Sequence, residues 1–373
     1  PLLDLGPLGR VPAREAALAA TLTPEAVRLE RATLRLPAPP GGTLPGPVLE
    51  AAGEAARGAG GWRGALDLSL DRVRFADLAA YWPEGLRRDV REWITGNITA
   101  GEVVGGRWRF EAAMPEGADS LRLTALSGRA EARGATVHWL RPVPPVQGVD
   151  ATAEFSLDEI ALRLRGGRQL AGEGGRGGLE LREGRIRLHD LTGIPGQIEI
   201  ALQTAGPLPE VFALVRHPRL HLFDRRRLEV GAAAGQAEAQ VTIAFPLWRE
   251  VPLEQMRIRA AGRVTEARLT DALLGQDLER AALEVAVDTE GLRLSGQGML
   301  VGAPLRLSYE TDFRPRPAAG VVERATATGR MEARQLAALG FETHGVLAGP
   351  VAVEARFERR RNGQGQVSLR GDL

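Results

Sequence analysis

The side chains that could carry chemistry are few and poorly spaced for it. His217 and His221 lie four residues apart, as metal ligands on a helix do, but Pro218 between them argues against a shared helical face. The segment Gly172–Gly177 (GEGGRG) fits the glycine pattern of a dinucleotide-binding loop. A strand pattern rather than a helix follows it, so we interpret it as a hairpin loop. The chain contains no Lys, which excludes a Walker-type phosphate loop.

Carboxylates, hydroxyls and the remaining histidines form no catalytic pattern either. Glu154, Asp158 and Glu159 lie close together, but nothing distinguishes an acid from a base, as a glycosidase pair requires. No G-x-S-x-G elbow occurs, and the absence of Cys excludes disulfides, Cys nucleophiles and Cys-based zinc sites. The other histidines are interpreted as plain strand or loop residues: His138, His189 and His344. We therefore expect a protein that is not an enzyme and that uses no cofactor and no metal.

The charges are balanced and interleaved. The 48 basic residues, all Arg, and the 47 acidic residues give a net charge of +1. The short runs Arg225–Arg227 and Arg359–Arg361 are interpreted as solvated loops, with contact to anionic head groups as the alternative. Binding to a phosphate backbone needs a concentrated positive face, so we expect no nucleic-acid partner.

Neither a membrane-spanning stretch nor a signal peptide is visible in the sequence. No apolar run reaches the roughly 18 residues of a spanning helix. The chain opens at Pro1 rather than at Met, and we expect it to be a fragment of a longer chain from which an anchor or export signal has been removed.

Alternation of apolar and polar residues dominates the chain and is typical of half-buried strands. Clear examples are Ala65–Leu70, Arg107–Ala112 and Ala130–Leu140. The pattern predicts roughly 16 to 20 strands separated by Gly-rich or Pro-containing turns. Asn362–Gly363 is the strongest hairpin signal among these turns.

Few helices are predicted. Pro83–Thr95 has Pro in its first turn and apolar residues on one face, and Gly96 follows it as a C-cap. Pro207–Arg216 is a second helix, stopped by Pro218. Shorter helices are predicted at Glu15–Ala20, Val48–Arg57, Thr270–Leu274 and Arg334–Leu339.

So many one-faced strands require a cover that the helices are too short to supply. Exposing one large apolar side chain forfeits about 1.5–3 kcal/mol, so the apolar face must be sealed. We predict a mainly β fold: an elongated, curled antiparallel sheet that forms a hydrophobic groove, with a few short amphipathic helices. Residues 1–60 form an N-terminal strand and helix segment of the same groove, and residues 61–373 form the groove domain. The pattern alone leaves a closed sandwich or a barrel as alternatives.

The candidate site is the apolar face itself. We expect its groove to be lined by Trp108, Phe110, Val137, Trp139, Phe155, Leu157, Ile198, Ile200, Ile243, Phe245, Val285, Val287, Leu305 and Leu307. One helix face is interpreted as packing against the sheet, with gating of the groove as the alternative: Leu86, Val90, Trp93 and Ile94.

Four segments resemble the AsmA-like family of bacterial envelope proteins, in particular its YhdP-type branch. Leu66–Gly101 matches a strand, a "dl..y.P" phrase and an amphipathic helix that ends near Trp. Val137–Phe155 is similar to the family's strand, double proline, glycine and strand phrase. Ala205–Leu220 is similar to its helical linker, and Gly291–Leu307 is similar to its "gl.l.G...l.G.p..l" repeat.

The resemblance implies a repeating β-groove protein that is anchored in the inner membrane and projects into the periplasm. It implies transfer of phospholipid or another acyl lipid between the inner and outer membranes along the apolar groove, with no catalytic residues. Membrane contact is expected through segments outside this chain. The alternative is a non-catalytic envelope scaffold that binds proteins at an open sheet edge and aids outer-membrane assembly.

Overall fold

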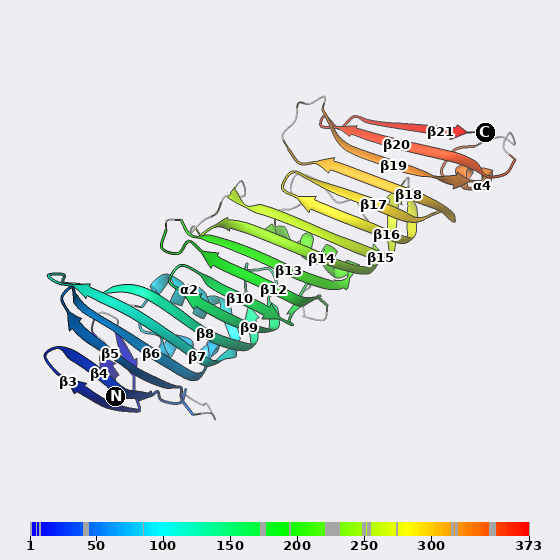
Figure 1. Ribbon diagram of the computed structural model, residues 1–373. Coiled ribbons are helices and arrows are strands. Elements are labelled where there is room, and N and C mark those ends of the chain that lie inside the picture. Colours follow the sequence, from blue (N-terminus) through cyan, green and yellow to red (C-terminus); the bar gives the residue numbers. More distant parts are fainter. Residues whose placement is uncertain are drawn as a thin grey trace. The chain divides into compact units, whose positions relative to one another are not determined.

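The computed structural model describes residues 2–4, 6, 9–39, 45–84, 86–171, 177–193, 195–220, 232–247, 251, 255–273, 275–314, 317, 320–342 and 348–372, except the side chain of Asp89. Of these residues, 66% lie in strands and 11% in helices. The strands form a large antiparallel sheet with a few short helices (Figure 1). The prediction of a mainly β fold of this kind is confirmed.

The chain divides into two compact units, which we describe separately. Unit 1 comprises 1–169, 183–199 and 246–250, and unit 2 comprises 170–182, 200–245 and 251–373. The boundary expected at residue 60 falls in the hairpin between β5 and β6, which both belong to unit 1. β12 (Leu179–His189) and β13 (Gln197–Pro207) contribute residues to both units.

Unit 1 is built from consecutive antiparallel neighbours. Its strands are β1 (Leu2–Asp4), β2 (Arg10–Pro12), β3 (Glu15–Leu22), β4 (Ala26–Arg35), β5 (Val48–Gly58), β6 (Gly61–Arg74), β7 (Ile98–Pro115), β8 (Arg122–Val137), β9 (Val146–Ser156), β10 (Ile160–Arg165) and β11 (Arg168–Gln169). Each strand from β3 to β10 pairs with the next, and β10 also pairs with β12. Its helices are η2 (Phe75–Asp77), α1 (Leu78–Tyr81) and α2 (Arg88–Asn97).

Unit 2 repeats this plan. Its further strands are β14 (Ala233–Pro246), β15 (Arg257–Leu273), β16 (Gln276–Asp288), β17 (Gly291–Leu300), β18 (Ala303–Asp312), β19 (Val321–Met331), β20 (Val351–Arg360) and β21 (Gly365–Asp372). Each strand from β14 to β21 pairs antiparallel with the next. Its helices are α3 (Leu208–Val215), η3 (Pro218–Leu220) and α4 (Ala333–Ala338).

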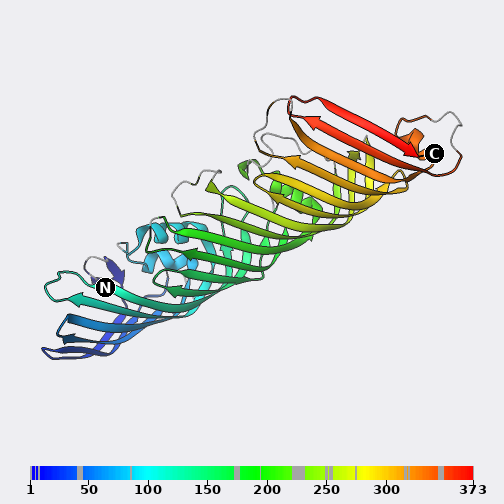
Figure 2. The ribbon, with the colours of Figure 1, turned by 45° about the horizontal axis from the view of Figure 1, so that its top comes forward.

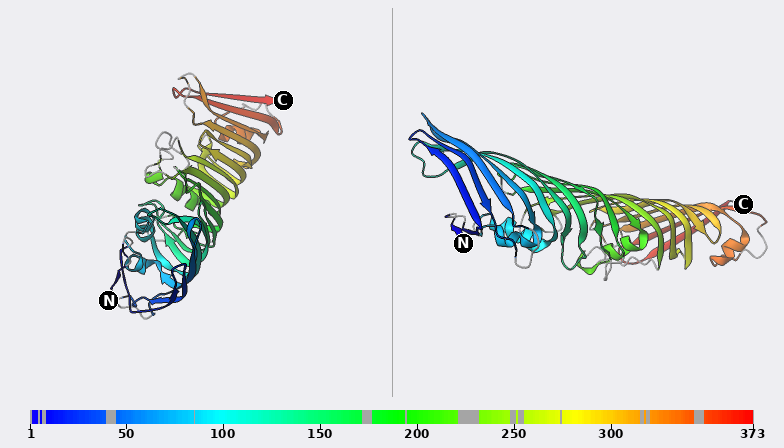
Figure 3. Two further views of the ribbon diagram at one scale, coloured as in Figure 1. Left: turned by 60° about the vertical axis from the view of Figure 1, so that its left-hand side comes forward. Right: turned by 90° about the horizontal axis from the view of Figure 1, so that it is seen from below.

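The helices of each unit lie against one face of its sheet, which we call the inner face (Figure 2). In unit 1, Tyr81 of α1 is buried with Leu36 and Val73, and the strands curl toward the side of α1 and α2 (Figure 3). In unit 2, Leu208 of α3 packs on Leu278 and Leu283. Among the described helices, none combines the length and apolar composition of a bilayer-spanning segment.

Two of the predicted helices form where the sequence placed them. α3 lies within Pro207–Arg216, and α4 begins with a capping box in which Glu332 and Gln335 bond each other's backbone. The helix predicted at Pro83–Thr95 is shorter and later, because α2 begins at Arg88.

Three predicted short helices are strands instead. Glu15–Ala20 lies in β3, Val48–Arg57 forms most of β5, and residues 270–273 end β15. The first two segments are rich in Ala, which favours helix, but all three have a strand to pair with. Tertiary pairing here overrides a local preference of a few tenths of a kcal/mol per residue.

The burial beneath α4 yields a test of the core. Leu300 is 1% exposed and packs with Leu305, Met331 and Leu336. We expect Leu300→Ala to lower the free energy of unfolding by about 2–5 kcal/mol, because a cavity remains. Leu292→Ala, at a half-buried position of the same strand, should cost less than half as much. Urea unfolding followed by circular dichroism measures both, and equal costs would contradict this packing.

Candidate functional site: the inner face of the sheet

The inner face of unit 1 carries a row of apolar residues that crosses nine strands. The strand registers place its members directly opposite one another, from β3 to β12: Leu18, Ala32, Ala51, Leu68, Trp108, Gly128, Phe155, Ile160 and Leu188. The adjacent residues on these strands form the outer face, where Ser69, Arg107 and Arg129 lie opposite one another, next to Leu68, Trp108 and Gly128. Successive side chains of a strand point to opposite faces, so a single register fixes both surfaces.

Unit 2 carries two apolar rows of the same kind across eight strands, β14 to β21. The first contains Ala239, Gly262, Val285, Leu294, Tyr309, Ala325, Phe357 and Val367. The second lies closer to the helices and contains Ala237, Val264, Leu283, Gly296, Leu307, Ala327, Ala355 and Leu369.

Only part of this face is covered by protein. On β16, Leu278, Ala281 and Leu283 are buried beneath α3, whereas Val285 and Val287 are half-buried. On β18, Leu305 is buried near α4 and Leu307 is half-buried. Burial therefore falls with distance from the helix on β16 from Leu283 to Val287, and on β18 from Leu305 to Leu307. An apolar strip remains that the described residues of the unit do not seal.

In unit 1, a tryptophan lies flat on this face because two glycines make room for it. A Cβ at Gly106 would lie 2.4 Å from Cη2 of Trp108, and a Cβ at Gly128 would lie 2.3 Å from its Cδ1. Both contacts are closer than real Cβ atoms allow, so the indole needs glycine at both positions. Phe155 lies beside it, with ring centroids 6.0 Å apart and planes inclined by 57°. The indole thus covers the floor of the face instead of projecting from it.

The outer face carries cross-strand ion pairs. Asp67 and Arg109 lie opposite each other, 2.8 Å apart, and so do Arg129 and Glu154, 3.5 Å apart. Both members of each pair are more than two-fifths exposed, so each contributes little to stability. Opposite charges across strands nevertheless disfavour other registers.

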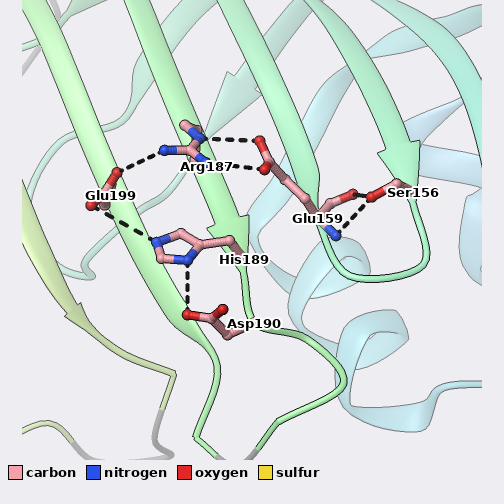
Figure 4. Close-up of polar contacts among 6 residues, drawn as sticks. All are labelled: Ser156, Glu159, Arg187, His189, Asp190 and Glu199. Carbon is pink, nitrogen blue, oxygen red and sulfur yellow. Dashed lines mark hydrogen bonds and ion pairs between the residues drawn. The ribbon is translucent and has the colours of Figure 1, made fainter.

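A cluster of polar side chains lies at strand ends of unit 1 (Figure 4). Arg187 donates from Nη2 and Nε to the two carboxylate oxygens of Glu159, at 3.0 and 3.1 Å, and from Nη1 to Glu199 at 3.3 Å. Nδ1 of His189 lies 3.0 Å from Asp190, and its Nε2 lies 3.8 Å from Glu199. The hydroxyl of Ser156 donates to the backbone carbonyl of Glu159.

Two carboxylates of this region, Glu159 and Asp158, are stabilised in their charged form. The hydrogen bond from Arg187 lowers the pKa of Glu159, and hydrogen bonds from the side chain and backbone of Thr192 lower the pKa of Asp158. A general acid needs the opposite shift. The cluster therefore links the ends of neighbouring strands, because Arg187 binds both Glu159 and Glu199.

Two shallow depressions lie on the polar side of the sheets. The depression in unit 2 has a volume of about 670 Å³ and is lined mainly by polar residues such as Arg263, Glu284 and Ser308. The depression in unit 1, of about 560 Å³, is lined by residues such as Glu50 and Arg107. Both depressions are open and contain surface ion pairs, Arg263–Glu284 in unit 2 and Asp67–Arg109 in unit 1, so we place the candidate site on the inner face.

Several predicted groove residues of unit 1 lie on the inner face. Trp108 and Phe155 belong to the central row, and Phe110 lies opposite Leu66 and Leu126. Ile198 is half-buried on β13. Val137 is the last residue of β8 and pairs with Ile98 and Val146, beside the end of α2.

Two predictions in unit 1 place residues on strands that end earlier. β8 ends at Val137, so Trp139 lies in the following turn, where its Nε1 donates to Gln169 at 2.8 Å. β9 ends at Ser156, so Leu157 lies just beyond it. The alternation continues past both strand ends, and turn geometry interrupts it.

In unit 2, most predicted residues are half-buried on the inner face: Ile200, Ile243, Phe245, Val285, Val287 and Leu307. Leu305 differs, because it is 5% exposed and packed with Met331 and Leu336 of α4. It belongs to the protein core and is closed to a ligand, which corrects its place in the predicted lining.

The predicted gating face is less coherent than the sequence suggested. Leu86 precedes α2 and is 41% exposed, and Trp93 is 51% exposed. Val90 and Ile94, four residues apart, are half-buried. Before α2, the indole Nε1 of Trp82 donates a hydrogen bond to the backbone carbonyl of Leu86 at 2.8 Å.

Several sequence motifs fall outside the described residues, and comparisons add no family. His221, His344, Arg225–Arg227 and most of Gly172–Gly177 are not described. Within the described part of the chain, no group of three or more His, Asp or Glu residues gathers to hold a metal. No family model, curated protein or solved structure matches the chain.

The residues that sequence reasoning missed are the partners across strands. Gly106 and Gly128 seat Trp108, and Leu68, Leu294 and Phe357 complete the rows. Leu68 and Leu294 stood in alternating segments, so period two could have found them. The role of Gly128 depends on a register that no local signal carries.

The need for glycine at position 128, beside the indole of Trp108, can be tested by a double-mutant cycle. Gly128→Ala should destabilise the protein by about 1–3 kcal/mol, because the added methyl overlaps the indole. In a Trp108→Ala background the same change should cost at least about 1 kcal/mol less. Urea unfolding of the four proteins gives the coupling, and additive costs would show that the indole does not lie against Gly128.

The hydrogen bonds from Arg187 to Glu159 predict that the stability of the protein depends on pH. A depressed folded-state pKa gives stability that is present above the ordinary value of 4.5 and is lost as the pH falls through the folded-state pKa. Glu159→Gln should therefore lower the melting temperature at pH 7, and the gap from wild type should narrow as the pH falls below 4.5. Thermal melts between pH 7 and 3 measure it. A gap that stays constant as the pH falls from 7 to 3 would contradict the assignment.

Proposed function

We propose that the protein carries phospholipid or another acyl lipid on the uncovered part of its inner face. The observation that supports this proposal is the fall of burial along β16, from Leu283 beneath α3 to the half-buried Val285 and Val287. The resemblance of segments such as Gly291–Leu307 to AsmA-like proteins agrees with it. By the same resemblance, transfer runs between inner and outer membranes in the periplasm of a longer, inner-membrane-anchored protein.

The chemistry of the strip favours a hydrocarbon. The backbone of a central strand such as β17 is paired with β16 on one side and β18 on the other. An extended peptide on this face would bury its N–H and C=O groups without partners, at a cost of about 1–3 kcal/mol each. An acyl chain has no such groups, and a helix satisfies its own, which leaves a helix as the rival occupant.

The dimensions also suit an acyl chain that lies along a strand. Leu292, Leu294 and Gly296 point to the inner face of β17, and all three are half-buried. Four residues of strand span about 14 Å. The hydrocarbon layer of one bilayer leaflet is about 15 Å thick. Neighbouring strands repeat the same rows about every 4.8 Å, so adjacent positions differ little in binding energy.

A scaffold function is the second candidate, and one observation favours it. All eight residues of β3 are exposed, including Leu18 and Leu22 at 73% each. An exposed strand of this kind can take up a strand of another protein. Such binding would use the margin of unit 1 and would not need the inner face.

Adjacent residues on β16 separate the two functions. Val285 points to the inner face and Ala286 to the outer face. We expect Val285→Glu to reduce lipid recovered with the purified protein at least tenfold, because a carboxylate cannot share the strip with hydrocarbon. Ala286→Glu should retain the wild-type amount. Native mass spectrometry and lipid extraction measure both.

Two outcomes would count against lipid carriage. One is wild-type protein that yields no acyl lipid after exposure to phospholipid vesicles. The other is equal lipid in the two variants while circular dichroism shows both to be folded. Undiminished binding of a partner protein by a folded Val285→Glu variant would favour the second candidate.

A further inference from the structure

Two arginines face each other on the outer side of unit 1. Arg107 of β7 and Arg129 of β8 lie directly opposite each other, and both are exposed. Like charges in this relation destabilise a pair of strands, whereas opposite charges stabilise it. Two residues farther along β7 the charges do match, because Arg109 lies opposite Asp67. The stability of the sheet alone therefore does not account for an arginine at position 107.

The guanidinium of Arg107 has no partner among the residues that the structure describes. Its other cross-strand neighbour is Ser69, whose hydroxyl forms no hydrogen bond with those residues either. Arg129 lies 3.5 Å from Glu154 and 3.9 Å from Glu131, and its side chain is 58% exposed. A guanidinium carries five N–H donors, so both arginines have donors left for a ligand.

The depression of unit 1, of about 560 Å³, opens onto these two arginines and the serine. Its lining contains four arginines and three acidic residues. Two of the acids are already engaged: Asp67 pairs with Arg109 at 2.8 Å, and Glu30 accepts a hydrogen bond from Thr21 at 2.6 Å. The third acid, Glu50, lies on β5, two strands away from β7. The positive charge of the depression is therefore concentrated on β7 and β8.

We infer that Arg107, Arg129 and Ser69 form a binding site for a phosphate group on the outer face of unit 1. A guanidinium matches phosphate oxygens in geometry and charge and binds them with two parallel hydrogen bonds. A phosphate between Arg107 and Arg129 replaces their repulsion with two attractive contacts. The hydroxyl of Ser69 donates a further hydrogen bond. The site lies on the opposite face from the lipid strip, so this inference does not rest on the proposed function.

A second pair of arginines supplies a matched control. Arg163 and Arg185 also lie directly opposite each other on the outer face of unit 1, but neither lines the depression. Arg185→Gln removes the same charge as Arg107→Gln and relieves a repulsion of the same kind. A difference between the two variants therefore reports on the depression and not on net charge.

Calorimetric titration with inorganic phosphate, against chloride at equal ionic strength, tests the site. We expect saturable binding to wild type, a Kd at least fivefold higher for Arg107→Gln, and a change of less than twofold for Arg185→Gln. Thermal melts give a second readout, because a ligand that binds only the folded state stabilises it. Phosphate should raise the melting temperature of wild type and of Arg185→Gln but not that of Arg107→Gln. In chloride, Arg107→Gln should melt no lower than wild type, because it removes a like-charge contact.

Flotation with phosphatidylcholine vesicles, with and without phosphatidic acid, identifies the source of the phosphate. Flotation that depends on phosphatidic acid and that Arg107→Gln alone reduces assigns the site to a lipid head group. Binding of inorganic phosphate, with flotation that does not distinguish the two variants, assigns it to free phosphate.

Three results would overturn the site. One is wild-type protein that binds neither probe, and another is equal weakening of binding in the two variants, which shows only a diffuse attraction to anions. The third is an Arg107→Gln protein that melts below wild type in chloride, which shows that this arginine stabilises the fold without a ligand.

Discussion

The constraint on which the structure depends is that period-two alternation puts a whole face of apolar side chains on each sheet. α3 has 8 residues and is about 12 Å long, whereas β15 has 17 residues and extends about 58 Å. The helix can therefore cover only one end of the strands it packs on. Leu278 and Leu283 are buried there, and Val285 is left half-buried farther along. The candidate site is the part of the apolar face that the helix does not cover.

The outer face keeps that arrangement in register. A slip of one residue between two strands would turn every side chain to the opposite face. Asp67 opposite Arg109 and Arg129 opposite Glu154 would then enter the apolar rows. Each exposed pair adds little stability, but the penalty for burying a charge without its partner is large. Charge alternation on one face and apolar alternation on the other thus specify the same pairing.

The sequence predicted the class of fold and the face of the site because both follow from local alternation. It also located α3 and α4, where proline and capping signals coincide with apolar spacing. It failed at β3 and β5, whose alanines favour helix in isolation and strand only when neighbours pair with them. It could not show that α4 covers Leu305, that Gly128 lies beneath Trp108, or that Arg107 lies opposite Arg129. Each depends on a register or a helix docking set by distant residues.

The most direct measurement of the central claim is photo-crosslinking at neighbouring positions that face opposite sides. A benzophenone amino acid would be placed at Leu68 or Ser69 in unit 1 and at Leu294 or Ser295 in unit 2. After ultraviolet irradiation with radiolabelled phospholipid vesicles, we expect labelled adducts from Leu68 and Leu294 and background from the two serine positions. Equal labelling at both members of each pair, or no labelling at Leu68 and Leu294, would contradict the assignment of the inner face as a lipid surface.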